Sequence, residues 1–520
     1  MKISYKLFVI CLGALVLRVA MVGFVKHPGI ADPNEYYNVG RSLAEGHGFQ
    51  TDYIWQYYNP PDSVVHPIDW WLPLTAVLAA GGMKLFGINV QASLLFFVIL
   101  GSVLPVLSYL AARQLDGSER ASLFAAAAAA VLPEFYLNSL RTNTLIPNAV
   151  LVCGCFLLWV HWLRHGAVTA LLASGVLAGL AYLTRSENLL LLPAFIATLA
   201  VYGLSGHPIR RRHWPYIALA PLVALAVASL WLWRNYHVFG WLTPPHQQRI
   251  FFWTDIRDQY TYNRDLTWET LRASQSMTQI VAKRLFEMAA SVKVMVTSLD
   301  GFLPVAVIGG MGLLLTRRDW NRLLTLAPTL ILLSGFFFFY TVMAPFMSQG
   351  GSFKKAYLSL VPLLIPVGAY AIEQAIPDRR MQLGTLAIVI VLMGADAVEM
   401  MRADIRFTND YLSDMKKVVT ALHTLPDTNG DGRITLMTQD PFVMSFLGVA
   451  AVMIPMESRE TVLEVAQRYS VDYLMMPPAR PSLDPLYYGT DTDPRFPLIQ
   501  EIRGTKIVIY GFRTSTSGPQ

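Results

Sequence analysis

The sequence predicts a polytopic α-helical membrane protein with a small C-terminal α/β soluble domain. Of its 520 residues, 54% are hydrophobic and only 15% are charged, a balance typical of membrane proteins. Apolar segments long enough to cross a bilayer recur as far as Met400. After Arg402 the composition becomes that of a soluble domain. We therefore expect a transmembrane domain over residues 1–402 and an external domain over residues 403–520.

Eleven transmembrane spans are expected, together with juxtamembrane helices. The segment 70–87 is apolar, but Pro73, Gly81 and Lys84 interrupt it, and its unbroken part is shorter than the ~20 residues that a span needs. We interpret it as a juxtamembrane element. The predicted spans are 7–25, 91–113, 121–136, 144–163, 168–184, 188–204, 215–236, 298–316, 322–342, 352–373 and 382–400.

The basic residues predict the orientation of the chain. If 70–87 does not span, the Lys/Arg clusters all fall on one side, which the positive-inside rule makes cytoplasmic. The N-terminus is then cytoplasmic, whereas the loops 26–90 and 240–297 and the C-terminal domain are external. The net charge of +6 is thus a topological signal, and we expect no nucleic-acid partner. The clusters are Lys2/Lys6, Arg113/Arg120, Arg164, Arg210 to Arg212, Arg317/Arg318/Arg322 and Arg379/Arg380.

The first predicted external loop begins with two carboxylates. Asp32 and Glu35 follow the first apolar segment directly, in the run A-D-P-N-E-Y-Y-N-V-G-R-S-L-A-E-G-H-G-F over residues 31–49. Pro33 predicts a helix start with Asp32 at the cap, and Gly46 ends the helical spacing. An Asp before a Pro at a helix start is also an ordinary N-cap, so a purely structural role is an alternative.

This run resembles the first external loop of the polyprenyl-phosphate-dependent integral-membrane glycosyltransferases of the GT-C class. It is most similar to the group that contains protein O-mannosyltransferases and the aminoarabinose transferase acting on lipid A. In that group an Asp-Glu pair opens the loop, and the Asp is the catalytic base. Asp32 matches the Asp, but Pro33 stands where the Glu would be, and Glu35 is a displaced substitute. The resemblance implies catalytic roles for Asp32 and Glu35, and substrate-binding roles for Tyr36, Arg41 and His66.

Three later segments resemble parts of the same class that line the cavity for the lipid-linked sugar. The resemblance implies that their charged residues bind substrate: Arg185 and Glu187, which can pair, Arg234, and the pair Lys354 and Lys355. The alternative is that the arginines snorkel at the interface and the lysines anchor a helix end among lipid head groups. The segments are 182–188, 231–236 and 350–355.

The resemblance implies a glycosyltransferase that moves a hexosyl or pentosyl group, with inversion, from a polyprenyl-phosphate donor. The acceptor would be a lipid, glycan or protein at the external face of a bacterial inner membrane, among membrane lipids. A carboxylate that accepts the acceptor's proton suits this chemistry, and the leaving phosphate needs cations. A secondary transporter or lipid flippase is one alternative, although the predicted span interiors carry few charges. A non-catalytic assembly protein is another.

The C-terminal segment alternates helix-like and strand-like patterns, which is typical of a three-layer α/β domain. It contains no Gly-rich phosphate fingerprint, so we assign it no cofactor. Asp427, Asn429 and Asp431 resemble the front of a calcium loop, but Thr438 stands where a bidentate Glu is needed. A polar turn is the favoured interpretation, with a divalent cation as the alternative. Helices are expected at 409–425, 442–447 and 459–469, and strands at 434–437, 450–454, 472–476, 498–502 and 506–512.

Overall fold

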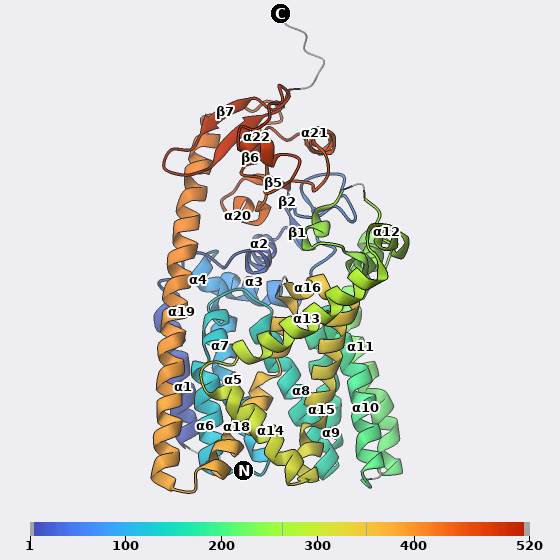
Figure 1. Ribbon diagram of the computed structural model, residues 1–520, viewed down its shortest axis with the longest axis vertical. Coiled ribbons are helices and arrows are strands. Elements are labelled where there is room, and N and C mark those ends of the chain that lie inside the picture. The colour runs from blue at the N-terminus through green and yellow to red at the C-terminus, as the bar shows by residue number, and fades with distance from the viewer. Residues whose placement is uncertain (1–4, 208, 263, 350, 514–520) are drawn as a thin grey trace, which may run out of the picture. The chain divides into compact units, whose positions relative to one another are not determined.

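The chain folds into two compact units that alternate along the sequence (Figure 1). The computed structural model describes residues 5–207, 209–262, 264–349 and 351–513. The helical unit comprises Met1–Val25, Trp71–Thr243 and Met277–Asp404. The sheet unit comprises Lys26–Trp70, Pro244–Ser276 and Ile405–Gln520.

The helical unit holds the membrane-spanning helices. Among the described residues, seven helices are long and apolar enough to cross a membrane, or eight if the bent pair α17–α18 is one span. A helix lies at every predicted span, but the count of eleven is not confirmed, because α6, α9 and α14 have only 13, 15 and 14 residues. The helices are α1 (Tyr5–Val22), α3 (Leu74–Phe86), α4 (Val90–Ser93), α5 (Leu95–Gln114), α6 (Glu119–Val131), α7 (Pro133–Asn138), α8 (Leu145–His165), α9 (Val168–Tyr182), η1 (Ser186–Leu190), α10 (Leu191–Leu204), η2 (Arg211–His213), α11 (Trp214–Phe239), α13 (Met277–Thr297), α14 (Leu303–Thr316), α15 (Trp320–Phe338), η5 (Phe339–Met343), α16 (Pro345–Gln349), α17 (Ser352–Leu358), α18 (Val361–Ala375) and the first part of α19 (Arg379–Leu422).

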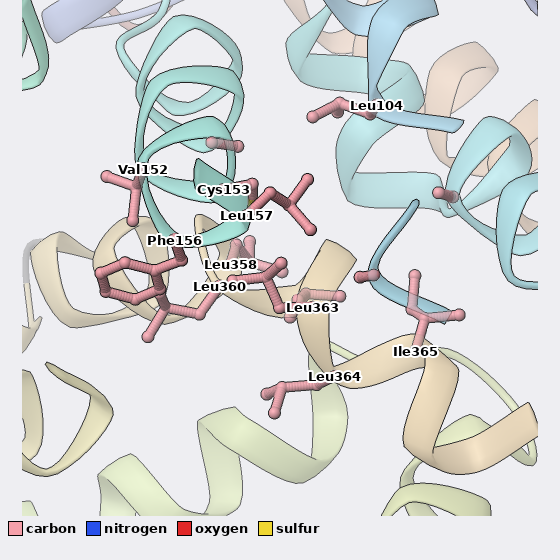
Figure 2. Close-up of a cluster of buried hydrophobic side chains, with 14 of the residues drawn as sticks. Leu104, Val152, Cys153, Phe156, Leu157, Leu358, Leu360, Leu363, Leu364 and Ile365 are labelled. Atoms are coloured by element: carbon pink, nitrogen blue, oxygen red, sulfur yellow. The ribbon is translucent and has the colours of Figure 1, made fainter. Parts of the chain in front are cut away.

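The bent pair α17–α18 packs in the core of the helical unit. The two helices meet at an angle of 58°, and Pro362 lies in the first turn of α18, where its missing N–H costs no helical hydrogen bond. Apolar side chains of α8 face the bent pair, with Phe156 and Leu157 opposite Leu358 and Leu363 (Figure 2). The core therefore forms around a break in a helix that the sequence predicts as continuous.

Small residues bring the backbones of α9 and α11 together. A Cβ on Gly175 would lie 2.4 Å from the carbonyl oxygen of Ala220, and one on Gly179 would lie 2.6 Å from that of Ala224. Only glycine fits at such distances, and close approach of this kind is a main source of helix association in membranes. The short helix α9 is therefore held by packing against its neighbour.

The sheet unit contains a six-stranded mixed sheet in the order β2-β5-β4-β6-β8-β7. β2, β5, β4 and β6 are parallel, whereas β8 pairs antiparallel with both β6 and β7. A separate antiparallel pair joins β1 to β3. The elements are α2 (Asp32–Glu45), β1 (Gln50–Thr51), β2 (Tyr53–Ile54), β3 (His66–Pro67), η3 (Pro245–Phe252), η4 (Ile256–Tyr260), α12 (Trp268–Ser274), the rest of α19, β4 (Thr435–Thr438), α20 (Pro441–Phe446), β5 (Ala450–Met453), α21 (Arg459–Arg468), β6 (Tyr473–Met476), α22 (Asp484–Tyr487), β7 (Leu498–Glu501) and β8 (Val508–Gly511).

Both faces of the sheet are covered, as a three-layer α/β domain requires. Val462 and Val465 of α21 pack on one face. Val418 of α19 and Val443 of α20 pack on the other. Each predicted C-terminal strand has an observed counterpart, so the prediction of an α/β domain is confirmed. The helix expected at 409–425 is present as the last part of α19, which runs from the last predicted span without a break through 44 residues.

The edge strand of this sheet comes from the first loop and not from the C-terminal segment. Tyr53 and Ile54 of β2 pair in parallel with Ala451 and Val452 of β5. Tyr53 and Ile54 are also buried, on opposite faces of the sheet. The loop that carries the two predicted carboxylates is thus part of the same folded unit as the C-terminal segment.

Candidate active site

The acidic motif lies on α2, a buried helix of the sheet unit. Ala31 is the N-cap, with no side-chain capping bond, and Asp32 is the first helical residue. The predicted cap at Asp32 is therefore wrong by one position, because the chain enters the helix through Ala31 with φ at 58°. Pro33 lies in the first turn, and Gly46 ends the helix in the left-handed conformation, both as predicted.

Glu35 is a buried carboxyl group held by a tyrosine. Its exposed fraction is 1%, and Tyr53 Oη donates a hydrogen bond to Oε2. Burial raises the pKa of Glu35 well above its usual value, and the charge of Asp32 raises it further. The carboxylates of Asp69 and Asp52 act in the same direction. Glu35 therefore holds a proton under conditions in which an ordinary carboxyl group is ionised.

Asp32 differs from Glu35 in its surroundings. Its side chain is half-buried at the start of α2, where solvent reaches it. Of the two acids of the motif, Asp32 is thus the more accessible to solvent.

Other polar residues of α2 attach it to α20. Arg41 Nη2 donates to Ser445 O at 3.0 Å, and Asn38 Nδ2 donates to Phe442 O at 2.9 Å. Ser445 Oγ in turn donates to Asp52 Oδ1. Arg41 was predicted to bind substrate, and in this structure its guanidinium holds a neighbouring helix. Tyr36, the other predicted substrate-binding residue of α2, is buried.

His66 lies on β3, opposite Thr51 of β1. Its Nδ1 donates to Val64 O at 2.9 Å. When the ring is neutral, it therefore carries its proton on Nδ1. Burial lowers the pKa of His66, against the raising effects of this hydrogen bond and of Asp52. His66 is therefore a neutral imidazole near neutral pH.

A second carboxylate site near Glu35 was not predicted from the sequence. Asp69 Oδ2 lies 3.5 Å from His246 Nε2 and accepts a hydrogen bond from Asn59 Nδ2 at 3.3 Å. The imidazole of His246 stacks on Trp70, with ring centroids 6.1 Å apart. Burial and then the charge of Arg249 lower the pKa of His246 to about 4. Asp69 therefore faces a neutral ring.

The helical unit carries a polar cluster around Arg185. The predicted pair with Glu187 is present, through Arg185 Nε. Arg185 Nη1 also donates to Thr144 Oγ1 at 3.1 Å, and Nη2 donates to Tyr340 Oη at 3.4 Å. Tyr340 lies in η5, a π-helical turn, which is a feature frequent at functional sites. The cluster brings together side chains from three separate segments of the chain.

Lys354 belongs to α17 and contacts Glu134, a residue for which the sequence predicts no role. Its Nζ lies 2.7 Å from Glu134 Oε1 of α7, and Asn138 Nδ2 donates to Glu134 O at 2.8 Å. Lys355 follows on the same helix, after Gly351 at φ 82°. The preceding Gly350 of the predicted motif lies outside the described residues.

Arg234 lies near the end of α11 and contacts its own segment. Its guanidinium carbon is 4.6 Å from the centroid of the Trp231 ring and 5.0 Å from that of Phe239. Nη1 donates to Asn235 Oδ1 at 3.0 Å. These contacts fix the guanidinium among aromatic rings, an arrangement typical of cation–π pairs.

The segment that resembles a calcium loop forms a polar turn. Asp427 Oδ1 accepts from the backbone N–H of Gly430 at 2.7 Å, and Oδ2 accepts from that of Gly432 at 2.6 Å. Asn429 Nδ2 donates to Asp472 Oδ1 at 2.9 Å, and Asp431 accepts from the N–H of Arg433. The described residues contain no group of three or more His, Cys, Asp or Glu side chains arranged to hold a metal ion.

Comparisons with known proteins show which fold the chain has. The family model described as dolichyl-phosphate-mannose-protein mannosyltransferase matches residues 65–233. ArnT from Cupriavidus metallidurans, solved with undecaprenyl phosphate, has a similar structure, with a TM-score of 0.61 and 14% identity over 99% of this chain and 98% of that chain. The oligosaccharyltransferase of Archaeoglobus fulgidus in its apo form has a TM-score of 0.55 and 11% identity over 90% of this chain and 69% of that chain. The chain has the GT-C fold.

The resemblance to the GT-C membrane glycosyltransferases is thereby confirmed, and the chain is a multi-pass membrane protein. No curated protein matched the sequence. The matched residues of the family model include His66, Arg185 and Glu187 but exclude Asp32 and Glu35. The family match therefore gives no information about Asp32 and Glu35, and a role for either must be argued from its surroundings in the structure.

Proposed function

We propose that this protein transfers a sugar from a polyprenyl-phosphate donor to a lipid, glycan or protein acceptor. The observation that carries the proposal is the family-model match within a GT-C fold. The undecaprenyl phosphate named with ArnT supports a donor of the same chemical class. A location at the external face of a bacterial inner membrane is supported by the one-sided distribution of arginines in the sequence.

Asp32 is the general base of the proposed reaction. The acceptor oxygen forms a bond to the anomeric carbon while its proton passes to the Asp32 carboxylate. The bond from that carbon to the phosphate oxygen breaks, and its electron pair leaves with the phosphate. A single displacement of this kind inverts the anomeric centre. The raised pKa of Glu35 and the half-buried position of Asp32 support this choice of base.

The cations of the helical unit receive the charge of the leaving phosphate. Charge grows on the leaving oxygen toward the transition state, so donors fixed in advance lower the barrier. Arg185 offers a planar fork of donors that suits a phosphate, and Lys354 offers a point charge. Both residues are paired with carboxylates, Glu187 and Glu134. These carboxylates hold the cations in place until a phosphate competes for them.

The experiment that tests this function uses the purified full-length protein with a panel of polyprenyl-phosphate sugars. Release of polyprenyl phosphate is followed by mass spectrometry, and the anomeric configuration of the product is determined by NMR. We expect release with one or a few sugars, and an inverted product. Asp62→Asn, in the same loop but exposed, is the control for Asp32→Asn. Transport of an intact lipid without cleavage of the sugar–phosphate bond would contradict the proposal.

A further inference from the structure

A cavity of about 520 Å³ lies in the helical unit, away from the residues proposed to act on the donor. Trp162 and Arg164 line it from the end of α8, and Thr325 lines it from α15. The Thr144–Arg185 contact lies at the beginning of α8. Because α8 has 21 residues, its two ends are separated by about 30 Å. The cavity therefore belongs to the opposite end of the helical unit.

The walls of the cavity are basic. Arg164 and Arg210 both line it, with Asp116 as the single acid among its lining residues in the described part of the chain. Arg164 Nη2 donates to Thr325 Oγ1 at 2.6 Å, which uses one donor of the guanidinium and orients the others. His207 also lines the cavity, and its Nδ1 donates to Ser205 O at 3.1 Å.

Trp162 supplies a buried donor that has no partner. Its side chain is 1% exposed, and its indole Nε1 makes no hydrogen bond in the described structure. Buried N–H groups in folded proteins are nearly always paired, because an unpaired one loses the hydrogen bond that water would make. A cavity lined by an unpaired N–H donor and two arginines favours an acceptor ligand with negative charge.

We propose that this cavity binds a phosphate group, carried by an anionic lipid head group or free in solution. The arginines provide charge, and the indole N–H of Trp162 provides a directed donor. Basic pockets between transmembrane helices are typical binding sites for anionic head groups. The volume of the cavity suits a head group but not the acyl chains, which would remain in the bilayer. This site is separate from the proposed donor site and does not depend on the proposed transferase activity.

The test uses the full-length protein in detergent and native mass spectrometry. Phosphatidylglycerol, dioleoylglycerol and inorganic phosphate are titrated separately, so that the phosphate and the acyl chains are compared. Bound phosphatidylglycerol that inorganic phosphate does not displace would assign the site to a lipid. Displacement by inorganic phosphate would assign it to the free ion. Dioleoylglycerol, which has no phosphate, is expected not to bind at this site.

Three variants distinguish binding in this cavity from non-specific attraction of an anion to positive charge. Arg164→Gln with Arg210→Gln removes both cavity arginines and should abolish binding of the phosphate group. Arg379→Gln with Arg380→Gln removes the same charge from α19, away from the cavity lining, and should leave binding unchanged. Trp162→Phe keeps a ring but removes the N–H, and should weaken binding about tenfold.

The outcomes decide the proposal even if one variant folds poorly. Melting curves and gel filtration identify folded variants, and Trp162→Phe tests the site without any change of charge. Unchanged binding in Trp162→Phe and in the Arg164 and Arg210 double variant would overturn the proposal. Equal losses in the cavity and control double variants would also overturn it, because the binding would then be non-specific.

Discussion

Lys354 Nζ lies 2.7 Å from Glu134 Oε1, so a cation predicted to bind the donor phosphate is already paired with a carboxylate. The two residues are 220 positions apart in the sequence. The Lys354 side chain is 40% exposed, and exposed ion pairs are weak, worth up to about 1 kcal/mol. A doubly charged phosphate can therefore displace the glutamate from the lysine.

The first prediction concerns this pair. Glu134→Gln removes the competing charge, so affinity for polyprenyl phosphate should rise, by about threefold to tenfold. Lys354→Ala should lower the affinity while the yield of folded protein stays normal. Binding is measured by microscale thermophoresis in detergent. Lys293→Ala, an exposed lysine of α13, is the matched control. If Lys354→Ala reduces yield but leaves affinity unchanged, the lysine anchors a helix end instead.

The second prediction concerns the proposed base. Asp32→Asn keeps the size of the side chain but removes the proton acceptor, so turnover should fall by roughly 100-fold or more. Glu35→Gln should lower turnover less, because burial raises the pKa of Glu35 and a neutral amide resembles the protonated carboxyl group. Turnover per folded molecule is measured by release of polyprenyl phosphate. An active Asp32→Asn protein with an inactive Glu35→Gln protein would reverse the assignment.

The third prediction concerns pH and stability. Because the folded-state pKa of Glu35 is raised, the folded protein binds this proton more tightly than the unfolded chain. Its contribution is complete below the unfolded pKa of about 4.5 and is lost as the pH rises toward the folded value. Glu35→Gln removes this titration. The melting temperature of the variant, relative to the unmodified protein, should therefore increase between pH 5 and pH 8.

The difference in melting temperature between the Glu35→Gln variant and the unmodified protein reports the titration of Glu35 alone. The lowered pKa of His246 gives a slope of opposite sign, with stability rising between about pH 4 and pH 6.5. That effect is common to both proteins and cancels in their difference. Parallel melting curves across the pH range would show that Glu35 is ionised in the folded state.

The fourth prediction concerns membrane orientation. Cysteines placed at Asp62 and Asp431 should react with an impermeant maleimide added to intact cells, whereas one at Arg380 should react only after lysis. All three positions are exposed. The background replaces the three native cysteines, Cys11, Cys153 and Cys155. Labelling at 380 with protection at 62 and 431 would invert the predicted topology.

Much of the fold is predictable from local sequence patterns. Apolar length predicts a helix at each expected span, and alternating patterns predict the C-terminal strands, because both signals are contained within a single element. The number of spans is not predictable in this way. α9 is short, and glycines in its sequence pack it against α11, so its length alone does not decide whether it crosses the bilayer.

The candidate site is less predictable, because its contacts join distant segments. Two separate sequence segments predict roles for Asp32, Glu35 and Arg185, but nothing near Glu134 or Asp69 in the sequence indicates their partners. The hydrogen bond from Tyr53 to Glu35 depends on β2, a strand of two residues that is too short to show any periodicity. The raised pKa of Glu35 is therefore a property of the folded chain.

The pairing of β2 with β5 has a consequence for engineering the protein. A chimaera that exchanges residues 405–520 for those of a relative also removes the partner of the Tyr53 strand, and with it the support of the tyrosine that binds Glu35. Swapping the C-terminal segment alone should therefore disturb the acidic helix as well. Modular exchange between such proteins requires the first loop and the C-terminal segment to be transplanted together.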